Sequence, residues 1–200
     1  EELARHFTLS LSGRAKNVAP HLAKVVPMDG VTTLLDVGGG TGLYSYALLQ
    51  VNPNLRAVIV ELPEVARIAE EFAREKALQD RVEIIDGDMF RIDDLPAAEV
   101  VLFSNILHDW DEPECFELIS RYAAKLPSGG RMLIHDVFLN DAMDGPLPIA
   151  LYSSALFSVT EGRAYSAAEY RAMLSAAGLV ADGSVVNTLV HCAVLTGTKP

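Results

Sequence analysis

The sequence contains few of the features that mark secreted, membrane or metal-binding proteins. Among its 200 residues there are two cysteines, Cys115 and Cys192, which stand far apart, so neither a disulfide framework nor a C-x-x-C zinc site is expected. No stretch is long and apolar enough to predict a transmembrane helix, and no cationic leader followed by an apolar segment predicts a signal peptide. We therefore expect a cytoplasmic protein without a membrane partner.

Basic residues are also scarce. Lysine and arginine together number 16, against 27 acidic residues, and the formal net charge is −11. A protein that grips a phosphate backbone needs a basic cluster, and the sequence has none. The composition therefore argues against nucleic acid as a partner and favours a small-molecule acceptor, while solubility alone also accounts for the acidic balance.

Half of the residues are hydrophobic, which is enough for one sizeable core in a chain of this length. Helical periodicity predicts two helices within residues 1–29, which form a lead-in to one catalytic domain over residues 30–200. The sequence opens without a methionine, and we interpret it as part of a longer protein.

The stretch LLDVGGGTGLYSYALLQ, residues 34–50, organises the rest of the prediction. A short apolar strand over residues 31–37 meets three consecutive glycines, and a helix follows with Leu43, Ala47 and Leu48 on its inner face. Glycines between a strand and a helix allow a ligand to approach the backbone closely. A tight turn without a ligand is the alternative interpretation.

Two features of this turn predict the ligand. The dinucleotide fingerprint G-x-G-x-x-G is not completed after Gly38 and Gly40, because its third glycine falls on Leu43. Asp36 at the end of the strand would repel phosphates and attract a cation. S-adenosylmethionine carries a sulfonium cation, a ribose and an adenine, and it has no phosphate. It is therefore the predicted cofactor.

The ends of the next two strands supply further candidate cofactor residues. Glu61 ends the second strand, where it is placed to accept both hydrogen bonds of a ribose diol. After the third strand, Asp88 is placed to accept from the adenine amine, with Met89 or Phe90 against the ring face. The alternatives are an exposed strand-end charge for Glu61 and a position at the edge of the core for Met89 and Phe90.

The pattern as a whole predicts an open, mostly parallel α/β sheet with helices on both faces. The predicted strands after the first cover residues 56–60, 81–86, 100–105 and 131–138, and a closing antiparallel pair covers residues 184–190 and 192–198. The predicted later helices cover residues 63–77, 113–126, 149–159 and 166–177. Ser166 and Glu169 form a capping box at the start of the last helix.

His108 and Asp136 are the candidate acid–base pair at the carboxyl ends of the fourth and fifth strands. Histidine titrates near neutral pH and suits a general base that takes a proton from the acceptor, and Asp136 would orient its ring. The pairs His108-Asp109 and His135-Asp136 also suggest a metal site. His135 and Asp136 point to opposite sides of an extended strand, so we expect no metal.

Five segments, DVGGGTG, VELPEV, GDMF, ILHDWDE and PSGGRMLIHD, together resemble the S-adenosylmethionine-dependent small-molecule O-methyltransferases. The similarity is to the caffeate and hydroxyindole type, including bacterial polyketide- and pigment-tailoring members, and it covers nearly the whole chain. The resemblance implies a Rossmann-like class I methyltransferase of seven strands, the last antiparallel. It also implies transfer of a methyl group to a hydroxyl of a small aromatic metabolite.

By the same resemblance, Glu61 holds the ribose, Leu62 and Met89 flank the adenine, Asp88 meets its amine, and His108 is the base. Members of the family usually form homodimers through an N-terminal helical domain. We expect that domain to lie outside this sequence, and we expect a homodimer for the full-length protein.

Two positions depart from the family pattern. A lysine often found four residues before the base is Ser104 here, and we place Ser104 with the cofactor-binding residues. A second acidic residue, expected in a G-[KR]-E-R-[TS] segment, is Ala164 here, which leaves Asp136 as the expected partner of His108. Methylation of an acidic carbon therefore stays open as an alternative, as do a non-catalytic cofactor-binding role and a nicotinamide-dependent dehydrogenase.

Overall fold

The computed structural model describes residues 2–181 and 183–200 of the chain. The chain divides into two compact units between Leu102 and Phe103. Eight strands lie in the described residues, where the sequence predicted seven. The additional strand is β6, two residues long, which pairs with β5 and does not form part of the main strand order.

The first unit is built on parallel strands in the order β3-β2-β1-β4, and of β4 it includes the residues up to Leu102. Their bounds are Val82–Asp86 for β3, Arg56–Glu61 for β2, Thr33–Val37 for β1 and Val100–Ser104 for β4. Apart from a half-buried Thr33, the residues of β1 and of the paired part of β4 are all buried. Because both faces of these strands are covered, their sequences are mostly apolar and do not alternate with polar residues. The register pairs Asp36 at the end of β1 with Ile59 of β2.

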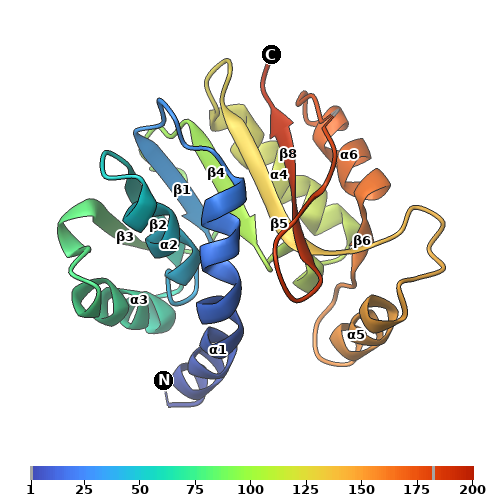
Figure 1. The fold of residues 1–200 in the computed structure, drawn as a ribbon, viewed down its shortest axis with the longest axis horizontal. Coiled ribbons are helices and arrows are strands. Elements are labelled where there is room, and N and C mark those ends of the chain that lie inside the picture. Colours follow the sequence, from blue (N-terminus) through green and yellow to red (C-terminus); the bar gives the residue numbers. More distant parts are fainter. Residues whose placement is uncertain (1, 182) are drawn as a thin grey trace. The chain divides into compact units, whose positions relative to one another are not determined.

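Three helices belong to this unit: α2 and α3 pack on its strands, and α1 packs on α2 and α3 (Figure 1). Their bounds are Glu2–Val25 for α1, Leu43–Val51 for α2 and Pro63–Glu75 for α3, and a short 3₁₀ turn, η1, spans Gln79–Arg81. Leu43, Ala47 and Leu48 of α2 are buried as predicted.

The prediction of two helices before residue 29 is wrong, because α1 is continuous. The hydroxyls of Ser10 and Ser12 donate to the carbonyls of Phe7 and Leu9, so these residues bond to the helix instead of breaking it. Pro20 also lies inside the helix. Packing of α1 along α2 stabilises the helix over these weak positions.

The second unit is built around β5 (Arg131–Leu139), which pairs antiparallel with β8 (Cys192–Thr198). β7 (Val186–Asn187) pairs antiparallel with β8, and β6 (Tyr165–Ser166) pairs parallel with β5. The helical elements are η2 (Leu107–Asp109), α4 (Glu112–Lys125), α5 (Leu147–Phe157) and α6 (Ala167–Ala176). α4 packs on α6, α6 on β8, and α5 on β5 (Figure 1).

Two predictions near the end of the chain have different outcomes. The capping box of α6 is confirmed, since Ser166 Oγ accepts from Glu169 N and the Glu169 carboxylate accepts from Ser166 N. The long strand predicted over residues 184–190 is wrong, because β7 covers two residues. Val190 and His191 have left-handed backbone φ angles of 53° and 61°, so the chain turns there instead of continuing as a strand.

The turn between β1 and α2 requires glycine at its last position. Gly42 has φ 75°, and a Cβ at this position would lie 2.3 Å from Cζ of the fully buried Tyr46. Tyr46 does not move aside easily, because its hydroxyl donates to the carbonyl of Ala69 at 2.7 Å. The turn therefore sits directly on the core of the first unit.

We predict that Gly42→Ala destabilises the protein by about 3 kcal/mol, the sum of left-handed strain and overpacking. Gly30→Ala is the matched control: Gly30 also has a left-handed φ, 73°, but nothing lies within 4 Å of its added Cβ, so about 1–2 kcal/mol is expected. Urea unfolding of both variants measures the difference. Equal losses would show that Tyr46 does not restrict this turn.

Candidate active site

Asp36 is a buried carboxylate at the end of β1. Its side chain is 1% exposed, and its Oδ2 accepts a 2.6 Å hydrogen bond from Ser45 Oγ on α2. Its Oδ1 has no hydrogen-bond partner among residues 2–181 and 183–200. Burial raises the pKa of Asp36 to about 7, Ser45 opposes this rise, and the charge of Glu61 adds to it. A cation bound here would relieve both the burial and the repulsion.

Glu61 lies at the end of β2 and faces the same turn. Its two carboxylate oxygens accept hydrogen bonds from Gly40 N at 2.9 Å and from Leu62 N at 2.8 Å. Burial raises the pKa of Glu61, while these two N–H groups lower it. The side chain is thus fixed at the glycine turn and is not an exposed strand-end charge.

The turn itself leaves room on one side. A Cβ at Gly40 would meet nothing within 4 Å, whereas one at Gly39 would lie 2.7 Å from Ile59 and 2.9 Å from Asp36 Oδ2. Gly38 N donates to the Val60 carbonyl, which continues the β1–β2 pairing into the turn. Two carboxylates beside an open backbone, one of them with an unpaired buried oxygen, fit a cationic ligand with a diol such as S-adenosylmethionine.

The candidate adenine residues follow β2 and β3. Asp88 accepts from Phe90 N at 2.9 Å and forms an ion pair with Arg91 at 3.4 Å. Met89 and Phe90 are half-buried, and Leu62 is 52% exposed. These side chains are available at the surface of the first unit, and their contact with adenine stays a prediction.

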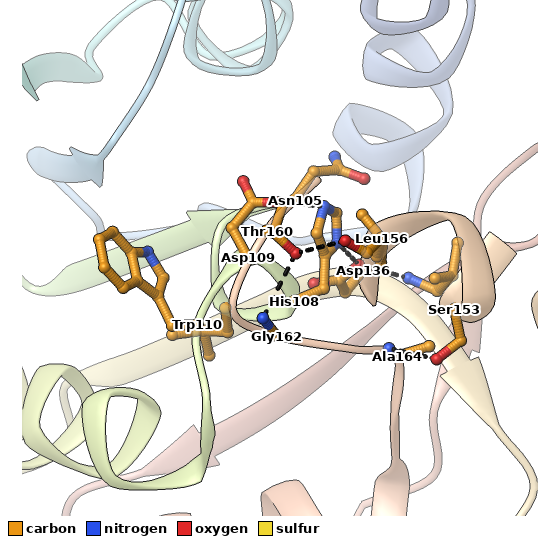
Figure 2. A network of polar contacts seen from close by, with 12 residues as sticks. Asn105, His108, Asp109, Trp110, Asp136, Ser153, Leu156, Thr160, Gly162 and Ala164 are labelled. Carbon is orange, nitrogen blue, oxygen red and sulfur yellow. Dashed lines mark hydrogen bonds and ion pairs between the residues drawn. The ribbon is translucent and has the colours of Figure 1, made fainter. Parts of the chain in front are cut away.

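His108 lies in the second unit, in the turn η2 that follows β4. Asn105 takes a left-handed φ of 56° and turns the chain, which buries the imidazole to 4% exposure. His108 Nδ1 is 2.5 Å from Asp136 Oδ1 of β5, and Asp136 is 1% exposed (Figure 2). The predicted pair is therefore brought together by two segments that are remote in the sequence.

Asp109 lies on the other side of the same imidazole. Its Oδ1 is 3.6 Å from His108 Nε2. Burial raises the pKa of Asp109, His108 lowers it, and the charge of Asp136 raises it. The imidazole thus has a carboxylate near each nitrogen. The sequence analysis did not predict this arrangement, because it considered Asp109 only as part of a possible metal site.

Sequence reasoning missed three residues that hold the His108 turn in place. A Cβ at Gly162 would lie 2.4 Å from the His108 carbonyl oxygen, so the segment carrying it packs backbone to backbone on the turn (Figure 2). Tyr165 Oη donates to the Trp110 carbonyl, and the Tyr152 ring of α5 meets the His108 ring edge-on with centroids 5.7 Å apart. Tyr152 belongs to an apolar helix, and nothing in its local sequence marks it.

Ser104 and His135 form a second buried pair on the other side of β5. Ser104 Oγ is 2.8 Å from His135 Nδ1, and His135 Nε2 is 3.1 Å from Thr188 Oγ1. Asp136 points to the opposite face of β5 from His135, and there it contacts His108, as the strand alternation predicted. A role of Ser104 in cofactor binding stays a prediction. In the part of the chain that the structure describes, no three His, Cys, Asp or Glu side chains form a metal-binding group.

The sequence profile of the O-methyltransferase domain family matches residues 1–180. The chain belongs to this family. A 3-hydroxy-5-methyl-1-naphthoate 3-O-methyltransferase of Streptomyces sahachiroi is 37% identical over 80% of the chain and 46% of its own length. An L-tyrosine C(3)-methyltransferase of Streptomyces lavendulae is also 37% identical, over 79% of the chain and 44% of its own length.

Among solved structures, an O-methyltransferase family 2 protein of Planctomyces limnophilus in complex with apigenin is 47% identical to the chain. The two structures superpose with a TM-score of 0.94, and the match covers 98% of the chain and 62% of the Planctomyces limnophilus protein. The predicted O-methyltransferase family and the predicted mostly parallel α/β fold are confirmed by these matches.

The chain spans about half the length of the curated relatives that it matches. Within residues 2–181 and 183–200, none of the helices has the length and apolar character needed to cross a membrane.

We predict that the free energy of unfolding falls as pH rises from about 4 to about 7, because the folded state keeps Asp36 protonated in this range. A rise in pKa from 3.8 to about 7 corresponds to about 4 kcal/mol, which is fully present below pH 3.8 and has been lost once the pH exceeds about 7. Asp36→Asn should remove this fall, and Asp80→Asn, at an exposed position, should retain it. Urea unfolding across this pH range is the measurement. An unchanged slope in Asp36→Asn would contradict the assignment.

Proposed function

We propose that the protein transfers the methyl group of S-adenosylmethionine to a hydroxyl oxygen of a small aromatic metabolite, with His108 as the general base. The observation that carries the proposal is the buried 2.5 Å contact between His108 Nδ1 and Asp136 Oδ1, in a chain of the O-methyltransferase family. An oriented imidazole is what an acceptor hydroxyl needs before it attacks an already activated methyl group.

The cofactor residues proposed for the first unit are Asp36, Gly38, Gly40, Glu61, Leu62, Asp88, Met89 and Phe90, and Ser104 is proposed for the second. When bound, the cofactor supplies an electrophilic methyl group on a cationic sulfur. Asp36 and Glu61 contribute negative charge in a buried setting, where it attracts a cation more strongly than it does in water. Gly40 allows close approach to the backbone.

His108 and Asp136 have different parts in the proposed proton transfer: His108 takes the proton, and Asp136 orients the imidazole. Asp136 Oδ1 accepts from His108 Nδ1, which fixes the tautomer and leaves Nε2 as the nitrogen that takes the acceptor proton. Asp136 then stabilises the imidazolium that forms. Asp109 Oδ1, 3.6 Å from Nε2, lies where the acceptor hydroxyl would arrive, and we assign it a part in receiving that group.

The relatives support an aromatic acceptor without naming it. The Streptomyces sahachiroi enzyme methylates a hydroxynaphthoate oxygen, and the Planctomyces limnophilus protein binds the flavone apigenin. We further propose a homodimer, and we propose the cytoplasm as its location, which agrees with the buried thiols of Cys115 and Cys192.

Carbon methylation is the second candidate, because the L-tyrosine C(3)-methyltransferase is as similar to the chain as the naphthoate enzyme is. A positioned base also serves this reaction, since it removes a phenolic proton and makes the ring carbon nucleophilic. The geometry of His108 and Asp136 suits both acceptors.

We predict that His108→Ala lowers turnover by about 10²-fold or more and leaves the affinity for S-adenosylhomocysteine unchanged, because only proton removal is lost. His191→Ala, at an exposed position, is the control and should keep both properties. Calorimetry measures the affinity, and a methyl-transfer assay with apigenin and simple phenols measures the turnover. Full turnover in His108→Ala would refute the assigned base.

The atom that receives the methyl group can be identified from the product. We expect a mass gain of one methylene unit and a methoxy signal in the NMR spectrum. A ring-bound methyl signal would establish carbon methylation instead. Binding of S-adenosylhomocysteine without any product from a broad panel of phenols would favour a non-catalytic cofactor-binding role.

A further inference from the structure

The two carboxylate oxygens of Asp136 differ in their hydrogen bonding. Oδ1 accepts from His108 Nδ1 and from the backbone N–H of Val137 at 2.8 Å. Oδ2 is buried, and no donor among residues 2–181 and 183–200 reaches it. A buried carboxylate oxygen without a hydrogen bond is costly, so this atom requires an explanation.

The hydroxyl of Tyr170 on α6 is a buried donor that lacks an acceptor in the described part of the chain. The whole Tyr170 side chain is fully buried. Its ring lies against Phe138 with centroids 5.7 Å apart and against Tyr165 with centroids 5.3 Å apart. One side chain thus lacks a donor, and the other lacks an acceptor.

The two groups lie on the same side of β5. Asp136 and Phe138 are two residues apart on this strand, so their side chains share a face, and Tyr170 packs on Phe138. Burial raises the pKa of Tyr170 well above its ordinary value, and the negative charge of Asp136 is the second cause. The hydroxyl therefore stays protonated at working pH and keeps a hydrogen to donate.

Two other donors of this region are already engaged: Cys115, whose pKa is raised by burial and also by the charge of Asp136, and Tyr165, whose ring lies against Tyr170. Cys115 Sγ donates to the Leu107 carbonyl at 3.0 Å, and Tyr165 Oη donates to the Trp110 carbonyl at 2.8 Å. Position 164, where the sequence analysis noted the absence of a carboxylate, is a fully buried alanine that contributes no polar side chain. The hydroxyl of Tyr170, in contrast, has no acceptor within the described residues, so its hydrogen is available to Asp136.

We propose that Tyr170 is a positioning residue that donates, through one ordered water, to Oδ2 of Asp136 and so fixes the carboxylate that orients His108. A single water satisfies both buried atoms, since it accepts from the tyrosine hydroxyl and donates to the carboxylate. The chain His108–Asp136–water–Tyr170 gives the imidazole a rigid anchor. This inference rests on the proposed role of His108 as the base.

The first test uses Tyr170→Phe and the NMR titration of the His108 ring, identified by its loss in His108→Ala. Removal of the hydroxyl leaves more negative charge on Oδ1, so the midpoint of the ring titration should move to higher pH by about 0.5 or more. Tyr122→Phe is the matched control, because Tyr122 is also fully buried but packs on Phe103, and it should leave the midpoint in place.

The second test needs no variant. A crystal structure of the full-length protein at high resolution should show one water within hydrogen-bond distance of both Asp136 Oδ2 and Tyr170 Oη. An unshifted midpoint in a folded Tyr170→Phe, or a structure without this water, overturns the proposal. Neither readout requires turnover, so failure of the protein to methylate any acceptor would refute the proposed function and leave this inference to be judged separately. Where turnover is present, Tyr170→Phe should lower kcat several-fold without changing cofactor affinity.

Discussion

The structure depends on two carboxylates that are held out of water at the ends of strands. Asp36 and Asp136 are each 1% exposed, and each has one oxygen hydrogen-bonded and one oxygen without a partner in the described part of the chain. Burial of an ionised carboxylate costs several kcal/mol unless a cation or a full set of donors compensates it. The two carboxylates are therefore the groups to which we assign binding and chemistry, and their surrounding residues suggest which role each one has.

The neighbours of the two groups differ, and so do their roles. Asp36 has a neutral hydroxyl donor in Ser45 and a second carboxylate, Glu61, nearby, so its charge is destabilised and a cation is favoured beside it. Asp136 has an imidazole and a backbone N–H on one oxygen, so its charge stabilises an imidazolium. In the proposed function the same type of side chain serves the cofactor in one unit and the base in the other, because burial makes each carboxylate respond strongly to its closest partners.

Errors in the sequence analysis fall where tertiary contacts outweigh local signals. The serines of α1 are typical of a helix boundary, yet their hydroxyls bond to helix carbonyls while the helix packs on α2 and α3. The alternation over residues 184–190 is typical of a strand, yet the left-handed residues at Val190 and His191 end the pairing early. The capping box at Ser166 was predictable because both of its partners lie within four residues.

By itself, the sequence determined the family, the fold class and the positions of Asp36, Glu61, His108 and Asp136 at strand ends. Each of these follows from a contiguous strand-to-turn pattern. Only the tertiary structure decided that Asp136 meets His108 Nδ1, that Gly162 packs on the backbone of His108, and that Tyr152 lies beside the imidazole. It also revealed the unpaired Oδ2 of Asp136 and the unpaired hydroxyl of Tyr170. These contacts join segments far apart in the chain, and their geometry is set by packing in the core, which no local pattern of residues encodes.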